Sequence, residues 1–193
     1  MSMNLGDKRG LAEFATSGTC MTCGFVPDKV DATDIVVGLR SFPARWRSAL
    51  ALHLDDDDPE TVLTGRPTPA DWSALEHAGH VRDVLHALDI RVQRVLREDE
   101  PVLPETHVTP PSGANEQGIA VVLAALTLSA DQFAETVARI APHEWVRTGF
   151  RASRSVNALD LAREAVHEGS HHLRLATQTM HQLRTAPADS LTP

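Results

Sequence analysis

Two histidines four residues apart are the residues whose types and spacing best suit chemistry. His167 and His171 belong to the run His-Glu-Gly-Ser-His-His at 167–172. Residues four apart in a helix project from one face about one turn apart, so a helix can offer two such imidazoles to one metal ion. Val166 and Leu173 place the run beside a buried face, where an imidazole needs a partner. The pair therefore predicts a metal site, with ordinary helix-surface histidines as the alternative.

An earlier segment supplies a third imidazole. His80 lies among the small pair Ala78 and Gly79 and the apolar Val81 and Val84, which suits a side chain that points into a helical bundle. We predict that His80, His167 and His171 hold a divalent ion. Three protein ligands leave a coordination position for water or substrate, as in catalytic rather than structural zinc sites. The alternative for His80 is a hydrogen-bonded core residue.

The polar neighbours of these ligands are expected to have lesser roles. Asp83 and Glu168 either orient a ligand imidazole or lie at the surface, and His77 and His172 are expected to support the ligands or face solvent. No residue stands out as a general base, so no catalytic residue is predicted. Three arginines are candidates for holding a carboxylate of a bound small molecule, with plain surface charge as the alternative: Arg82, Arg147 and Arg151.

A Cys-x-x-Cys sequence near the N-terminus is the other candidate for chemistry. Cys20 and Cys23, followed by Gly24, form a turn that can supply two thiolates to a structural zinc. Because the chain has no other cysteine, the remaining ligands would come from His, Asp or a second chain. A redox dithiol would lack the strand and helix of a thioredoxin-like context. Free thiols, a zinc site and a redox pair all stay open.

The composition disfavours several classes of protein. The 193 residues include 18 Lys plus Arg against 26 Asp plus Glu, a formal charge of −8, which suits a phosphate-backbone binder poorly. No stretch approaches the ~18 consecutive apolar residues of a membrane span. Residues 1–13 lack the apolar core of a secretory signal. We therefore expect a cytoplasmic protein that binds neither nucleic acid nor membrane, and whose cysteines are reduced or bound to metal.

Helical periodicity predicts the elements that position these residues. Apolar residues recur every three or four positions in four stretches. The first begins at Thr33, a predicted N-cap, and the second begins between Pro69 and Ser73; the others cover about 115–140 and 155–183. Alternation typical of strands is absent. The predicted fold class is therefore all-α, a four-helix bundle.

Breaks in this periodicity predict the organisation of the chain. Residues 1–30 are expected to be an irregular N-terminal arm, 31–185 the bundle and 186–193 a C-terminal tail. The acidic run at 55–58 before Pro59 predicts a solvated connection. The proline-rich segment 101–113 predicts a long loop over one end of the bundle, and long loops often line sites.

The segments around the candidate ligands resemble the DinB-like superfamily. These four-helix bundles include the metal-binding domain of mycothiol-dependent maleylpyruvate isomerase. The similarity extends from about 31 to 183, and the opening at 20–25 is similar to that of an actinobacterial branch. The segments that carry the resemblance are Trp72–Glu76, His80–Asp83, Trp145–Gly149 and His167–Leu173.

The resemblance implies a metal and a type of chemistry. It implies a divalent ion, zinc or nickel, held by His80, His167 and His171, and often a low-molecular-weight thiol such as mycothiol bound near that ion. A Lewis-acidic ion lowers the pKa of a bound thiol, and the thiolate then attacks a small electrophile; the same ion can instead activate water. We expect a metal-dependent thiol S-transferase or isomerase with a small-molecule substrate. A metal-dependent hydrolase and a non-catalytic metal- or ligand-binding stress-response protein are the alternatives, and a homodimer stays open.

Overall fold

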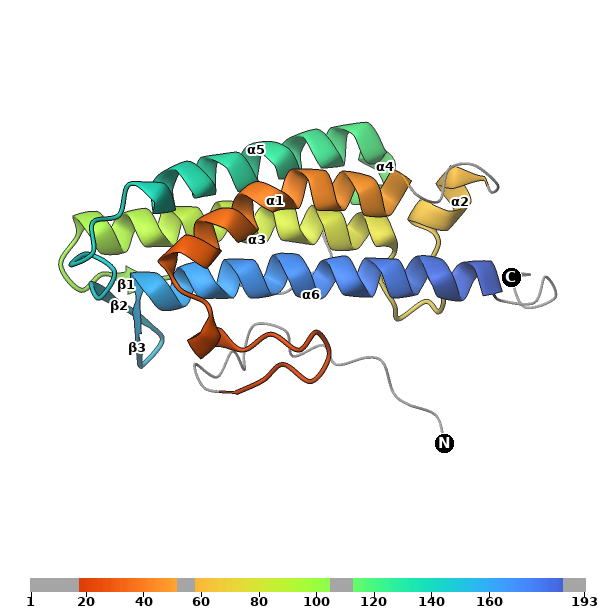
Figure 1. The fold of residues 1–193 in the computed structure, drawn as a ribbon. Coiled ribbons are helices and arrows are strands. Elements are labelled where there is room, and N and C mark those ends of the chain that lie inside the picture. The colour runs from red at the N-terminus through yellow and green to blue at the C-terminus, as the bar shows by residue number, and fades with distance from the viewer. Residues whose placement is uncertain (1–17, 52–57, 105–112, 186–193) are drawn as a thin grey trace.

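Four long helices form a bundle, which confirms the predicted fold class (Figure 1). The structure, a computed structural model, describes residues 18–51, 58–104 and 113–185. The long helices are α1 (Ala32–Ala51), α3 (Ala74–Arg97), α5 (Ile119–Ala138) and α6 (Ala158–Thr185). Three short helical elements lie between or before them: η1 (Pro27–Lys29), α2 (Pro59–Thr64) and α4 (Ala114–Gln117).

Each long helix packs mainly against two others. Helices α1 and α3 both pack on α5 and on α6, so the order around the bundle is α1, α5, α3, α6. Helices α3 and α5 run in the same direction, opposite to α1 and α6 (Figure 1). The connection between α3 and α5 must therefore return along the length of the bundle, which is why it is long.

Helix α1 buries the residues that its periodicity predicts, namely Ile35, Leu39, Phe42, Trp46 and Leu50. Its N-cap differs from the prediction. Asp31 Oδ1 accepts hydrogen bonds from the backbone N–H groups of Thr33 at 2.8 Å and Asp34 at 2.9 Å. The choice of Thr33 as the cap is therefore wrong, because the carboxylate two residues earlier is a charged acceptor at the positive end of the helix.

Helix α3 begins with a reciprocal cap. The Ser73 side chain accepts from the Glu76 N–H, and the Glu76 side chain accepts from the Ser73 N–H. This capping box fixes the start of the helix, just before the two histidines that follow. Both His77 and His80 lie on the buried face, together with the predicted apolar residues.

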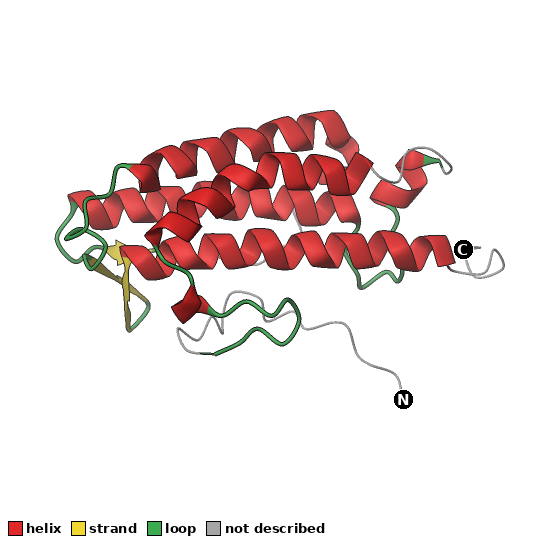
Figure 2. Cartoon of the chain, viewed as in Figure 1, coloured by secondary structure: helices red, strands yellow, loops and turns green. Residues whose placement is uncertain are grey.

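A small sheet at one end of the bundle corrects the expectation that the chain has no strands (Figure 2). Strand β2 (Thr148–Arg151) pairs antiparallel with β3 (Arg154–Asn157) and parallel with β1 (Val102–Leu103). The hairpin turn contains Ala152 at a positive φ of 53°. Strands of two to four residues are too short for alternation to be recognised, and the turn lacks the Asn-Gly or Asp-Gly signal.

The third predicted helix is divided in two. Gly118, with φ of 79°, separates α4 from α5, and glycine adopts this backbone conformation without steric cost. Among the described residues, α5 is the one helix long and apolar enough by length and composition to cross a membrane. It contributes Val122, Leu126 and Phe133 to the bundle core. A helix that packs in a protein core can have the same length and apolar composition as a membrane span.

Several predicted segments fall partly outside the described residues. These are positions 1–17 of the arm, 55–57 of the acidic run, 105–112 of the proline-rich loop and the tail at 186–193. The described part of the arm, residues 18–30, runs beside α6 (Figure 1).

Candidate functional site

One turn of α6 contributes to two groups of side chains. Adjacent helix residues point about 100° apart, so the pair at 167 and 171 and the pair at 168 and 172 face different directions. The outer cluster comprises Cys20, Cys23, His167 and His171, and the inner cluster comprises His80, Glu168 and His172. Within each cluster the candidate ligand atoms all lie within 4.8 Å of one another.

The structure divides the three predicted ligands between these clusters. It brings His167 and His171 together as predicted, but it places His80 with Glu168 and His172. Neither Glu168 nor His172 is at the surface, since they are 1% and 6% exposed. Their spacing is also four, so the sequence holds a signal for this second pair. Spacing alone does not determine which pair faces α3.

The inner cluster brings two imidazoles against one carboxylate inside the bundle. His80 Nε2 lies 3.5 Å from Glu168 Oε2, and His172 Nε2 lies 3.4 Å from the same oxygen. Among the described residues, His80 Nε2 and Glu168 Oε2 are buried without a hydrogen-bond partner. Buried polar atoms are almost always paired, so atoms that converge without hydrogen bonds fit a bound cation.

The separations in the inner cluster also fit a metal. Zinc bonds to nitrogen and oxygen of about 2.0–2.2 Å at tetrahedral angles place neighbouring ligand atoms about 3.3–3.6 Å apart. The observed separations of 3.4 and 3.5 Å lie in this range. Two histidines and one glutamate form a ligand set of catalytic zinc sites, in which another position is open to water or substrate.

His77 supports His172 from behind. Their Nδ1 atoms are 2.9 Å apart. If His172 binds a metal through Nε2, its proton is on Nδ1. The His172 Nδ1–H then donates this hydrogen bond, and His77 Nδ1 accepts it. Burial, with the nearby imidazole of His172, lowers the pKa of His77 far below its usual value. His77 is therefore neutral near pH 7 and able to accept.

Trp72 covers the inner cluster. Its ring centroid lies 5.3 Å from that of His77 and 5.0 Å from that of His80. It also stacks on His172 at 5.6 Å with an interplanar angle of 18°. Because Trp72 is itself half-buried, its indole separates these imidazoles from solvent.

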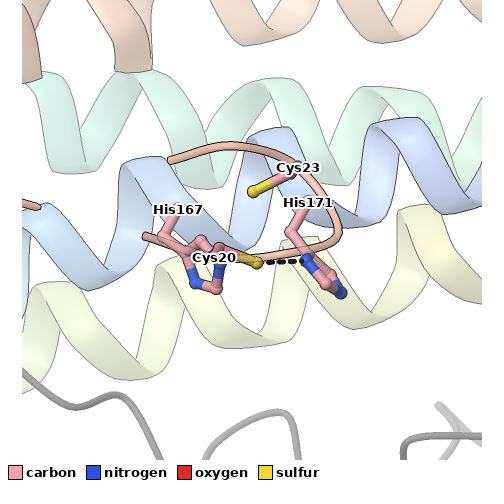
Figure 3. Close-up of side chains that lie close together, drawn as sticks. All are labelled: Cys20, Cys23, His167 and His171. Atoms are coloured by element: carbon pink, nitrogen blue, oxygen red, sulfur yellow. Dashed lines mark hydrogen bonds between the residues drawn. The ribbon is translucent and has the colours of Figure 1, made fainter. Parts of the chain in front are cut away.

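The outer cluster joins the N-terminal arm to α6, with the Cys20 and Cys23 sulfurs lying beside the two imidazoles (Figure 3). Cys20 Sγ is 3.5 Å from His171 Nδ1. The turn is closed by two backbone hydrogen bonds, from Cys20 N–H to the Phe25 carbonyl at 2.8 Å and from Gly24 N–H to the Cys20 carbonyl at 2.7 Å. Gly24 has φ of 76°, a left-handed conformation that favours glycine.

Hydrogen bonds favour the thiolate form of both cysteines. Burial raises the pKa of Cys20, but the backbone N–H groups of Cys23 and Thr22 and the side chain of His167 outweigh it and lower that pKa to about 7. Burial likewise raises the pKa of Cys23, and the side chains of His167 and His171 lower it below its usual value. The thiolate is the form that binds metals.

Glu168 touches both clusters. Its Oε1 lies 3.3 Å from His167 Nδ1 in the outer cluster, while its Oε2 contacts His80 and His172 in the inner cluster. Burial raises the pKa of this carboxyl, but the surrounding imidazoles of His167, His172 and His80 hold it well below its usual value. Glu168 is therefore ionised, and one negative charge serves both groups of imidazoles.

The other candidate residues have partners elsewhere in the chain. Asp83 is exposed and pairs with Arg82 at 2.7 Å. Arg147 donates to two backbone carbonyls, and Arg151 pairs with the buried Glu164 at 2.8 Å. Three of the remaining histidines are exposed and two lie outside the described residues: His86, His143 and His181, and His53 and His107.

Comparisons with known proteins agree with the bundle. The family model of the DinB superfamily matches residues 41–176, more than half of the chain. The chain is similar to a solved structure of YfiT from Bacillus subtilis, described as a probable metal-dependent hydrolase with an unusual four-helix bundle topology. The TM-score is 0.69 at 14% identity, covering 80% of this chain and 89% of that chain, which shows a shared fold. No curated protein matches the chain.

Proposed function

This chain belongs to the DinB superfamily, and from that premise we propose that it is a metal-dependent enzyme whose ion is held by His80, Glu168 and His172. The observation that supports this most is the convergence of their buried ligand atoms, two of which make no hydrogen bond among the described residues. Of the three ligands predicted from the sequence, the proposal retains His80. In place of His167 and His171 it uses Glu168 and His172, the pair that α6 directs inward.

The donor set indicates the class of ion. Imidazole nitrogen suits zinc, nickel, copper and iron, and a single carboxylate is compatible with all of them. With one ionised ligand, Glu168, and two neutral imidazoles, a divalent ion in this site would keep a net charge of about +1. We propose zinc, with nickel as the alternative.

The surrounding residues prepare the site for activating a nucleophile. A divalent ion held there supplies Lewis acidity, which lowers the pKa of a water or thiol in the open coordination position. His77 holds His172 in one tautomer and orientation through the 2.9 Å contact. Trp72 limits the access of bulk water to the imidazoles, and electrostatic interactions are stronger in such a low-dielectric environment.

We propose hydrolysis of a small molecule as the reaction. Two histidines and a glutamate are a ligand set of zinc hydrolases, and a protein of similar fold is described as a probable metal-dependent hydrolase. Transfer or isomerisation with a mycothiol-like thiol is the second candidate, supported by the resemblance carried by segments 72–83, 145–149 and 167–173.

Metal analysis and two activity assays on His80→Ala test this proposal. Wild-type protein is expected to carry metal in the inner cluster, measured by inductively coupled plasma mass spectrometry, and to hydrolyse members of a panel of 4-nitrophenyl esters. The second assay measures the consumption of a low-molecular-weight thiol in the presence of a panel of small electrophiles. Thiol consumption without ester hydrolysis would favour the thiol-dependent transfer or isomerisation. His80→Ala is expected to lose one metal equivalent and activity in either assay.

His86→Ala is the matched control, because His86 is an exposed histidine on the same helix. It should retain both the metal and the activity of the wild type. Unchanged metal content and activity in His80→Ala would contradict the proposal, as would a wild-type protein whose activity is the same with and without metal.

A further inference from the structure

We propose that the outer cluster is a second metal site, a closed Cys2His2 zinc site that fastens the N-terminal arm to α6. Its ligands are Cys20, Cys23, His167 and His171. The inference does not depend on the enzymatic function proposed above, because the two ligand sets share no residue. Glu168 contacts His167 of the outer cluster but is proposed as a ligand of the inner ion alone, so variants of the other ligands test the two sites separately.

The composition and size of the cluster fit a tetrahedral zinc ion. Two thiolates and two imidazoles form one of the standard structural zinc sets, and four protein ligands leave no open position. Zinc bonds of about 2.3 Å to sulfur and about 2.0–2.1 Å to nitrogen place a sulfur and a nitrogen about 3.6 Å apart. The 3.5 Å between Cys20 Sγ and His171 Nδ1 matches this spacing, and all four atoms lie within 4.8 Å of one another.

The backbone of the cysteine turn provides an independent observation. The turn is held by the Cys20–Phe25 and Gly24–Cys20 hydrogen bonds, and Gly24 has the left-handed φ of 76° that closes it. The turn holds both sulfurs beside the imidazoles of His167 and His171 (Figure 3). Two cysteines separated by two residues on such a turn are the usual way in which a short segment supplies two thiolates to one zinc ion.

The approach of the imidazoles distinguishes a metal site from a disulfide. A disulfide would engage the two sulfurs alone, whereas here two histidines from a helix more than 140 positions away in the sequence lie against them. The carboxylate of Glu168 lies behind one of these rings, 3.3 Å from His167 Nδ1. A carboxylate behind an imidazole is the usual support of a histidine that binds a metal.

The cysteine turn is the part of the described arm that a metal would fasten. Met21, in the middle of the turn, is 95% exposed. The residues after the turn are already attached to the bundle: Phe25 and Val30 pack against the core, Pro27 is buried, and Arg163 Nε donates to the Val30 carbonyl at 2.9 Å. Metal binding supplies folding free energy to segments that lack a core of their own.

Cobalt substitution of the full chain tests the proposal directly. The protein is kept reduced, stripped of metal and titrated with Co²⁺. We expect a thiolate-to-cobalt charge-transfer band in the near ultraviolet and strong visible bands typical of tetrahedral coordination. The inner cluster contains no sulfur, so it cannot produce the charge-transfer band. The band therefore reports on the outer cluster alone.

Variants assign the signal to residues. Cys20→Ser and Cys23→Ser should each weaken the charge-transfer band, because one thiolate–cobalt bond is removed, and should bind the outer equivalent of metal more weakly, while circular dichroism shows that the bundle helices persist. His80→Ala should keep the band, although it loses the inner equivalent. Met21→Ser in the same turn and His181→Ala, an exposed position on α6, are matched controls that should behave as the wild type.

Two results would overturn the proposal. One is a reduced wild-type protein that shows no thiolate-to-cobalt band, and the other is a Cys20→Ser variant whose band has the same intensity as that of the wild type. A second measurement checks the same point with zinc. The two thiols should resist a thiol-reactive dye in zinc-loaded protein and react after chelation, in wild type and His80→Ala alike. Equal reactivity before and after chelation would also overturn the proposal.

Discussion

The inner and outer clusters take their ligands from the same turn of α6, yet they have opposite characters. The inner cluster is buried among α3 and α6, offers nitrogen and oxygen, and has three candidate ligands. The outer cluster is less buried, offers sulfur and nitrogen, and has four candidate ligands, two of them from the arm. Adjacent helix residues point about 100° apart. One turn of α6 therefore contributes both to a cluster with the ligand composition of catalytic zinc sites and to a cluster with that of structural zinc sites.

The family match follows the same division. The matched region, residues 41–176, includes His80, Glu168 and His172 but excludes both cysteines. The inner cluster therefore lies wholly on the bundle that the superfamily shares. The outer cluster adds to that bundle a segment from outside the matched region.

Glu168→Gln should have the largest effect, because this carboxylate touches both clusters. We expect loss of the inner metal, since a neutral amide replaces the anionic ligand. We also expect the affinity of the outer site to fall by about 10- to 100-fold, as for carboxylates that support a metal-bound histidine. Titration with Co²⁺ against a chelator measures both affinities separately.

Glu164→Gln controls for the loss of a buried negative charge from α6. Glu164 is equally buried and pairs with Arg151, so this variant should lose stability but keep both metals. If Glu168→Gln bound both metals as tightly as the wild type, the link between the clusters would be disproved.

Gly169→Ala should weaken both clusters by moving α6. A Cβ at this position would overlap the ring of Phe42 on α1, and Phe42 is fully buried. Overpacking of this kind costs about 2 kcal/mol of unfolding free energy, measured by denaturant unfolding. Gly38→Ala is the control, because its Cβ would come to 3.3 Å from Val166 Cγ1. Gly38→Ala should cost much less unfolding free energy. Equal losses in the two variants would contradict the expectation that the contact between Gly169 and Phe42 is the tighter one.

His77→Phe should affect the inner cluster alone. The variant removes the acceptor for His172 Nδ1–H but keeps an aromatic ring beside Trp72. We expect the inner metal to bind about tenfold more weakly and the thiolate-to-cobalt band to be unchanged. A comparable loss at both sites would instead indicate a general disturbance of the bundle.

Arg163→Ala should have the smallest effect, and on the outer cluster alone. It removes the hydrogen bond to the Val30 carbonyl, which contributes about 1 kcal/mol and so about fivefold in the affinity of the outer site. Hydrogen exchange in residues 18–30 should rise accordingly. Arg174→Ala, at an exposed position of α6, should leave exchange in the arm unchanged.

Periodicity and spacing determined much of this protein from the sequence alone. The apolar residues of α1 predict its buried face because a helix repeats every 3.6 residues. The spacing of four at 167 and 171 likewise predicts neighbouring imidazoles. These properties are local, since each depends on residues within a few turns of one helix. The bundle and the histidine pair on α6 follow from them.

Only the tertiary structure decided how the ligands are grouped. The overlapping pairs at 167 and 171 and at 168 and 172 have the same spacing, and which pair meets His80 depends on how α6 is rotated against α3. The cysteines meet His167 and His171 because the arm folds back along α6, across more than 140 positions of sequence. Local patterns carry no information about such rotations and returns, because packing between distant segments determines them.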